Sequence, residues 1–335
     1  MLKKYKNFFI VVLIIVVVLV GIRIIGNHYS FESRDIQFES NQGTIEGILT
    51  TPKDNNGNLP LLVFVNGDGP TKMTNAGQYE PLMEKMADKG YACLSWNKPG
   101  VKKTEGDWQT QSMDDRADEV IDAIKFAKKQ PEINGDKIGL IGFQQAGWVL
   151  PKVSKKTKEI DYNILVAPSN NWIEDTKYSL AVRSDKAKDS KKEKEKLLKD
   201  FDESAELFAA NDNYEDYKKA AGKERALPEV RWTYKYLNFK EDVSDQLVNY
   251  YSPVKLIVGD KDASVDSKNT LKIYKKGVSE DLLDTTFIED TDHYMTTPEL
   301  VKSEIRTSFV ATLWPRKLLA EEYYDAIDKF IDKVK

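Results

Sequence analysis

The sequence predicts an α/β fold with a mostly parallel central sheet that is covered by helices on both faces. From about residue 35 onwards, short apolar runs alternate with stretches of helical period. Strands that are buried on both faces appear as nearly continuous apolar runs, and "LLVFV", "KIGLIGF" and "YNILV" are of this kind. The helical stretches between them supply the crossover connections that parallel strands need.

Composition narrows the class of protein. The chain of 335 residues is long enough to bury a large core. Its formal net charge is −4, with lysine and glutamate intermixed, which argues against nucleic acid as a partner because phosphate binding needs a dominant basic face. The one cysteine, Cys93, lies in an apolar run. We expect it to pack as a small hydrophobic residue, and no disulfide within the chain is possible.

Residues 1–26 are expected to form a single membrane-spanning helix. The run from Phe8 to Ile22 contains no polar side chain. A helix that rises about 1.5 Å per residue and continues to Ile25 covers about 27 Å of a hydrocarbon core about 30 Å thick. Arg23 can then reach the far interface with its long side chain.

Charges beside this segment predict its orientation. Three lysines precede the apolar run, namely Lys3, Lys4 and Lys6. Because basic flanks stay in the cytoplasm, we expect a single-pass cell-membrane protein with its globular part outside the cytoplasm. The alternative is a cleaved signal peptide and a secreted protein, for which Ile24-Ile25-Gly26 would be a poor cleavage site.

The expected domain boundaries lie where the alternation of apolar strands and helical stretches is interrupted. Residues 27–34 are expected to link the anchor to a core formed by residues 35–170 and 250–335. Residues 171–249 interrupt the alternation with a highly charged helical stretch and an aromatic segment. An insertion of this length between strands of an open sheet is most simply a helical cap.

The elements of the core can be assigned in chain order. A hairpin around Asn41-Gln42-Gly43 is followed by the strands "LPLLVFV" and "YACLSW". Ser112 and Asp115 form a capping box in front of an apolar helical stripe, and Pro131 ends that helix. The remaining strands are "KIGLIGF", "YNILV", "SPVKLIVGD" and "TTFIED", and a last helix runs from Leu318 to about Val334.

The stretch "KIGLIGFQQAGWVLPK" indicates a buried strand that turns sharply into a helix. Gly142 and Ala146 place small residues where the helix must cross close to the strand. The central residue of such a turn is usually a serine nucleophile, but here it is Gln144. A primary amide has no ionisable proton for a base to remove and cannot form a normal acyl-enzyme, so efficient serine-type hydrolysis is not expected.

Two later segments place an aspartate and a histidine after the last two strands. Asp262 follows one late strand in "GDKDASVD", and His293 follows the last strand in "DTDHYM". With the turn at Gln144 and the "NGDGP" loop, this order resembles the α/β-hydrolase superfamily, in particular its branch of dienelactone hydrolases and acyl thioesterases. The resemblance covers about residues 35–335. It implies that Asp262 orients the histidine and that His293 is the general base.

The resemblance also implies an oxyanion hole. Its donors would be the backbone N–H of Gln145 and one from Gly67 or Asp68. Members of the family are expected to carry "HGDGP" and "DKPG" where this chain has Asn66 and Asn97. Titratable or charged groups are therefore replaced at two positions besides Gln144.

Four aromatic residues of the cap are candidates for lining a substrate pocket: Trp172, Trp232, Tyr234 and Tyr236. The alternative is that they pack the cap onto the sheet. No cofactor and no metal are implied. The "DKDASVD" run places Val265 and Leu271 where a calcium-binding loop needs glycine and glutamate.

Three functions remain open from the sequence. The first is a membrane-anchored ester or thioester hydrolase in which Gln144 is either an introduced substitution or a natural loss. The second is a non-catalytic binding or regulatory protein that uses the old pocket for a small acyl- or ester-type molecule, which is favoured if Gln144 is native. The third is hydrolysis without a covalent intermediate, with His293 activating water. The sequence does not indicate an oligomeric state.

Overall fold

A central sheet dominates the computed structural model, which describes residues 2–334. Within these residues the sheet has eight strands in the order β1-β2-β4-β3-β5-β6-β7-β8. β1 pairs antiparallel with β2 and β2 with β4, whereas every later pair is parallel. The strands are β1 Phe31–Ser40, β2 Gly43–Pro52, β3 Leu59–Val65, β4 Ala92–Trp96, β5 Ile133–Phe143, β6 Tyr162–Val166, β7 Val254–Gly259 and β8 Leu283–Ile288. The predicted, mostly parallel sheet is confirmed.

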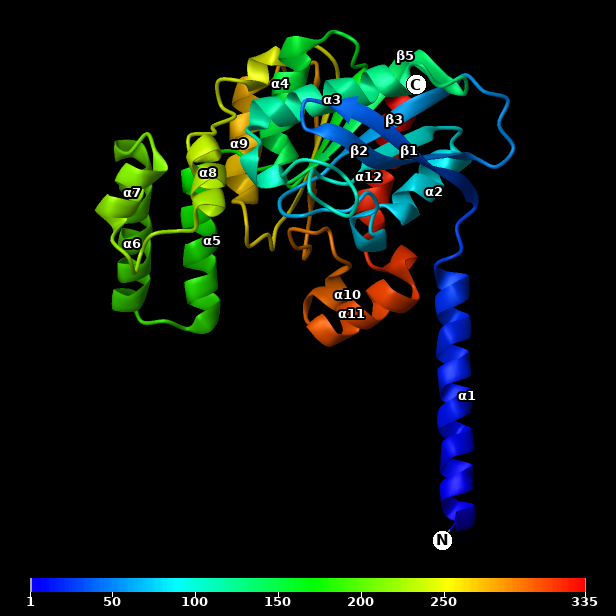
Figure 1. The fold of residues 1–335 in the computed structure, drawn as a ribbon. Helices are drawn as coiled ribbons and strands as arrows, with labels where there is room; N and C mark the ends of the chain where they lie inside the picture. The colour runs from blue at the N-terminus through cyan, green and yellow to red at the C-terminus, as the bar shows by residue number, and fades with distance from the viewer. Residues whose placement is uncertain (1, 335) are drawn as a thin grey trace.

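Helices cover both faces of the sheet (Figure 1). α3 Met113–Ala127, α4 Ala146–Lys156 and α9 Ser267–Gly277 contribute to one core, and α2 Glu80–Asp88 and α12 Glu321–Val334 contribute to the other. Alternate residues of β3 belong to the two cores: Leu61, Val63 and Val65 to the first, and Leu62 and Phe64 to the second. Side chains are therefore buried on both sides of this strand, which is why its sequence is apolar without alternation.

The linker between the N-terminal helix and the sheet is shorter than residues 27–34. β1 begins at Phe31, which pairs with Pro52 at the far end of β2. Tyr29 is buried, and its ring stacks on that of Phe31 at 5.5 Å. The core therefore starts at Phe31 and not at residue 35. Residues 32–35 looked like a linker because they are polar, but they form the solvent-exposed first part of β1.

α1 extends away from the body of the molecule as a single long helix, Leu2–Gly26 (Figure 1). Its stretch Phe9–Gly26 is long and apolar enough to cross a membrane, as signal anchors and signal peptides both are. Met1 of the expected 1–26 segment, and the side chains of the three N-terminal lysines, lie outside the described residues.

The insertion between β6 and β7 is helical. It contains α5 Trp172–Ala187, α6 Lys191–Ala210, α7 Tyr214–Ala221 and α8 Glu229–Asn238. A separate apolar cluster holds it together, consisting of Phe208, Tyr217, Ala221, Trp232 and Phe239. Two helices that the sequence patterns did not predict, α10 Pro298–Val301 and α11 Glu304–Leu313, follow β8. Short 3₁₀ turns lie at Asn75–Gly77, Trp108–Thr110, Leu247–Asn249 and Pro315–Lys317.

Candidate active site

The turn between β5 and α4 has a strained backbone at its centre. Gln144 has a φ of 50°, in the left-handed region that residues with a side chain rarely adopt. A Cβ atom on Gly142 would lie 2.7 Å from the Cβ of Ala146 and 2.9 Å from a methyl carbon of Leu150. The helix therefore crosses the strand too closely for a larger side chain at position 142. This geometry presents the side chain at position 144 at the carboxyl edge of the sheet.

Asp262 and His293 form a buried pair beyond β7 and β8. His293 Nδ1 lies 2.7 Å from Asp262 Oδ2, and both side chains are almost fully buried. The other carboxylate oxygen accepts hydrogen bonds from the backbone N–H groups of Ser264, at 2.7 Å, and Val265, at 3.0 Å. With Nδ1 directed at a carboxylate, Nε2 is left as the base of the neutral imidazole.

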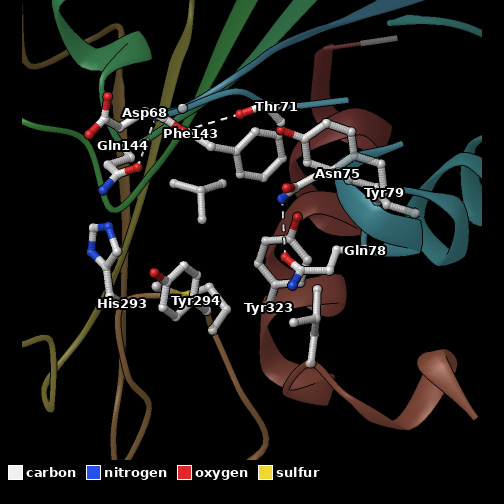
Figure 2. A pocket seen from close by; sticks show the side chains of 15 residues that line it. Asp68, Thr71, Asn75, Gln78, Tyr79, Phe143, Gln144, His293, Tyr294 and Tyr323 are labelled. Carbon is white, nitrogen blue, oxygen red and sulfur yellow. Dashed lines mark hydrogen bonds between the residues drawn. The ribbon is translucent and has the colours of Figure 1, made fainter. Parts of the chain in front are cut away.

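The carboxamide of Gln144 lies between Asp68 of the "NGDGP" loop and His293 (Figure 2). Its oxygen accepts a hydrogen bond from the backbone N–H of Asp68 at 3.1 Å. Its nitrogen end is on the side of His293 (Figure 2). The Asp68 N–H is one of the predicted oxyanion donors, and here it binds a carbonyl oxygen that belongs to the protein itself.

Next to Gln144 is a cavity of about 230 Å³. Figure 2 shows Tyr79, Phe143, Tyr294 and Tyr323 around it. Its remaining apolar lining comes from Leu82, Val166, Met295 and Leu319. The cavity thus combines apolar and aromatic walls with polar groups, a pattern typical of small-molecule sites. The polar groups are Gln144, His293 and Asp68 at one end and Thr71, Asn75 and Gln78 elsewhere in the lining (Figure 2).

A network of hydrogen bonds around the side chain of Gln145 supports the turn between β5 and α4. The side-chain nitrogen of Gln145 donates to Asp68 Oδ1 at 2.9 Å and to the hydroxyl of Tyr234, and its oxygen accepts from Arg116 at 3.0 Å. Arg116 also donates to the carbonyl of Asn66. The prediction for Gln145 concerned its backbone N–H and stays a prediction. Its side chain has a role that the motif did not predict, which is to join the turn, the "NGDGP" loop and the cap.

Two further buried charged residues belong to the surroundings of this network. Burial, together with the charge of Arg116, holds the pKa of Lys98 well below its ordinary value, and burial raises the pKa of Glu119. Glu119 accepts hydrogen bonds from the indole of Trp96 at 2.6 Å and from the amide of Gln111 at 2.8 Å. An arginine and a glutamate on the otherwise apolar stripe of α3 were the available sequence signal for this network.

Asp175 is an additional carboxyl group near the Asp262–His293 pair. Burial, and to a lesser extent the charge of Asp262, raises its pKa to about 7. Its Oδ2 accepts a hydrogen bond from the backbone N–H of Asn170 at 2.7 Å. Sequence patterns did not single it out, because it lies within the first turn of α5 and looks like an ordinary acidic N-terminus.

The two asparagines that replace expected family residues support loops. The amide of Asn66 donates to the carbonyl of Trp96 at 2.8 Å, and its oxygen accepts from the hydroxyl of Tyr79 at 3.1 Å. Asn97 Oδ1 accepts from the backbone N–H of Met73 at 2.9 Å. Both side chains are almost fully buried, so they act on loop geometry.

The four aromatic residues proposed for the pocket do not line this cavity. Trp232 belongs to the apolar cluster of the cap, and Trp172 and Tyr236 pack against that cluster. Tyr234 reaches the site by a different contact, since its hydroxyl donates to Asp68 Oδ1 at 2.8 Å. The prediction is corrected, and the alternative of packing the cap onto the sheet holds only in part, since Trp172 alone of the four also packs against the main core. The small cap buries large rings to hold its own helices together.

Comparisons with solved structures give the fold. An esterase of Pyrococcus furiosus superposes with a TM-score of 0.57 at 18% identity, over 91% of this chain and 92% of its own. An esterase of Thermogutta terrifontis gives 0.53 at 15%, over 90% and 99%. An acylaminoacyl peptidase of Pyrococcus horikoshii gives 0.54 at 18%, over 91% of this chain and 42% of its own. At these identities the likeness shows the α/β-hydrolase fold alone.

Sequence comparison gives the family. A curated relative, dipeptidyl-peptidase 5 of Porphyromonas gingivalis, is 25% identical over 109 residues, which are 30% of this chain and only 15% of that protein. The family model of the X-Pro dipeptidyl-peptidases (S15 family) matches residues 45–295, about three quarters of the chain. This range contains the turn at Gln144 as well as Asp262 and His293. The chain therefore belongs to the X-Pro dipeptidyl-peptidase (S15) family of α/β hydrolases.

Proposed function

We propose that this protein is anchored in a membrane by α1 and that its hydrolase pocket binds a small acyl- or ester-type molecule without serine-type turnover. The observation that carries the proposal is the carboxamide of Gln144 at the centre of the β5–α4 turn, with its oxygen on the Asp68 N–H. An amide nitrogen at this position is too weak a nucleophile to attack an acyl carbon. Even so, the surrounding groups match those that recognise a carbonyl.

The chemistry of the ligand follows from the cavity. Its apolar lining suits a short hydrocarbon or aromatic group, and the Asp68 N–H is a donor for one carbonyl oxygen. A ligand carbonyl would take the place that the Gln144 carboxamide now holds. The esterase and peptidase names of the similar proteins favour a ligand that contains an acyl carbonyl.

The anchoring part of the proposal rests on α1. Its apolar stretch is almost entirely exposed, as expected for a helix whose partner is lipid. The lysines before the apolar run favour an extracytoplasmic globular domain in a single-pass protein. Cleavage of the segment and secretion of the remaining chain is the alternative, and the mass of the mature protein distinguishes the two.

Gln144→Ser tests the proposal. A serine at this position would face His293, so we expect hydrolysis of short aryl esters to rise by at least about 10³-fold over the parent. Gln144→Ala is the matched control, because it removes the carboxamide without supplying a nucleophile. A fluorophosphonate probe should label the Gln144→Ser variant and leave the parent unlabelled. Labelling of the parent at a specific residue would contradict the proposal.

A second function is favoured by one observation, the intact 2.7 Å contact between His293 and Asp262. In this alternative, His293 activates a water molecule, and Gln144 orients that water or the substrate carbonyl. It requires parent turnover that disappears in His293→Ala but survives, at a lower rate, in Gln144→Ala. Turnover that is unaffected by His293→Ala would exclude it.

A further inference from the structure

α11 is a helix without a buried side chain. None of its ten residues is buried, although its sequence includes several large apolar residues. Ile305 is 84% exposed and Phe309 is 56% exposed, and a spacing of four residues places them on one face of the helix. Trp314, directly after the helix, is also exposed. A soluble protein rarely leaves such a row of apolar side chains uncovered, so this face indicates a partner.

The end of α11 is fixed to the end of α1. The side chain of Asn27 donates to the carbonyl of Thr312 at 3.2 Å. Arg316 donates to the carbonyl of Gly26 at 2.6 Å and to the carbonyl of His28, also at 2.6 Å. These bonds attach the end of α1 and the two residues after it to the last turn of α11 and to the segment that follows α11. α10 and α11 lie on the side of the body towards which α1 extends (Figure 1).

This attachment sets how far the exposed face can be from a membrane that α1 crosses. α1 remains apolar up to Ile25, and Gly26 contacts Leu313. Ile305 precedes Leu313 by eight residues, or about 12 Å along a helix. The exposed face of α11 therefore begins beside the end of the apolar stretch of α1.

The surroundings of the face include aromatic and basic side chains of the kind found at a membrane interface. Arg316, which is paired with Glu84, lies over the ring of Tyr29 at 4.4 Å, and Trp314 is two residues before it in the chain. On the α10–α11 segment the basic residues Lys302 and Arg306 are exposed, and so are the acidic residues Glu299 and Glu304. Aromatic and basic residues gather at this depth because their apolar parts contact acyl chains while their polar ends reach headgroups.

We propose that α11 lies in the lipid–water interface of the bilayer that α1 crosses, with Ile305 and Phe309 against the acyl chains. This inference rests on the proposed anchoring by α1. The continuity of the apolar face with the end of α1 favours lipid over a second copy of the chain. The protein would then hold the membrane at two points, which restricts how its globular part can tilt.

The same segment forms part of the wall of the cavity. Tyr294, which is 64% exposed, and Met295 line the cavity just before α10, and Leu319 lines it just after α11. Thr296 and Leu319 pair in an isolated bridge that closes the segment at its base. Contact of α11 with lipid would therefore place this wall of the cavity near the bilayer surface.

Fluorescence quenching in vesicles tests the proposal on the full-length chain. Cysteine is introduced by Ile305→Cys or Phe309→Cys, labelled with an environment-sensitive nitrobenzoxadiazole dye, and reconstituted in phosphatidylcholine–phosphatidylglycerol vesicles. The native Cys93 is fully buried and should not react. Val248→Cys is the matched control, because Val248 is 76% exposed on a turn that packs against α4 and α9. Val16→Cys reports on the insertion of α1 itself.

The expected result is a blue-shifted emission at positions 305 and 309 and at least about twofold quenching by nitroxide lipids, because interfacial helices insert about 5–10 Å into the headgroup boundary. Val248 should show neither effect. Quenching at Val16 without quenching at 305 and 309 would overturn the proposal and leave the anchor intact. Absence of quenching at Val16 would overturn the anchor, and the proposal with it. A blue shift at 305 and 309 that nitroxide lipids do not quench would assign the face to a protein partner and overturn the proposal.

Discussion

The two halves of the candidate active site differ in what they retain. On one side, Asp262 and His293 keep both the side chains and the 2.7 Å contact that acid–base chemistry needs. On the other side, the β5–α4 turn keeps the backbone of a nucleophile elbow, with φ of 50° at Gln144, but carries a carboxamide at its centre. The turn has this shape with a glutamine at its centre and small residues at Gly142 and Ala146, so its shape does not require a serine.

The largest expected effect tests whether the acid–base half still works. In the Gln144→Ser background, Asp262→Asn should remove most of the gained kcat for an aryl ester, a loss of about 10³-fold or more, because the imidazole loses its oriented tautomer. His293→Ala should lower it at least as much. The double variants are compared with Gln144→Ser alone, after their folding has been checked by circular dichroism. Equal kcat in all three would mean that the pair does not take part and that the two halves no longer form one site.

The second prediction concerns the turn itself. Gly142→Ala should lower the free energy of unfolding by about 3 kcal/mol, because the new methyl group meets Ala146 and Leu150 in a packed core. Gly135→Ala on the same strand is the control, since its methyl group would meet only the flexible side chain of Lys128, and it should change stability by less than about 0.5 kcal/mol. Urea unfolding in detergent measures both. Equal losses would show that close packing at position 142 does not shape the turn.

Much of the fold could be predicted because the central strands of the sheet are buried on both faces. β3, β6 and β7 are therefore nearly continuous apolar runs, and the positions of Gln144, Asp262 and His293 follow from their places at strand ends. α11 was not predicted because none of its residues is buried, so its few apolar side chains form no stripe long enough to indicate a helix. The contacts of Gln145, Arg116 and Tyr234 could not be predicted, because they depend on where the cap folds back over the sheet.

The third prediction concerns the carboxyl group beside the acid–base half. The pKa of Asp175 is raised to about 7 by burial, so between its ordinary pKa and about 7 the folded chain binds more protons here than the unfolded chain does. Asp175 therefore lowers stability progressively as the pH rises through this window, and its cost is complete above it. Asp175→Asn keeps an acceptor for the N–H of Asn170 and removes the cost. At pH 8 the Asp175→Asn variant should be more stable than the parent by about 2 kcal/mol, which is half of the free energy that the full pKa shift corresponds to. At pH 4 the two proteins should be equally stable.

Urea unfolding at several pH values measures this difference. Asp245→Asn is the control, because Asp245 is exposed and forms no ion pair with the residues that the structure describes. A difference between parent and Asp175→Asn that does not change with pH would contradict the assignment. It would mean that the pKa of Asp175 is not raised in the folded chain.

The smallest expected effect concerns the link between the cap and the nucleophile half. Tyr234→Phe removes a hydroxyl that donates to Asp68 Oδ1 at 2.8 Å, while Gln145 and the backbone N–H of Gly69 still satisfy that oxygen. The loss in the free energy of unfolding should be about 1 kcal/mol. Hydrogen exchange should quicken more at the amides of α8 than at those of α6, because the hydroxyl holds α8 onto the loop.

Tyr236→Phe is the matched control on the same helix, since its hydroxyl donates to Asp212 at 3.3 Å on the exposed surface and should contribute little. If both variants behave alike, the cap is held by its apolar cluster alone. If only Tyr234→Phe quickens exchange in α8, the cap and the Asp68 loop are coupled through one oxygen atom. A ligand that displaces the Gln144 carboxamide from the Asp68 N–H would then act on the same loop that Tyr234 holds, so binding in the pocket and the position of the cap would change together.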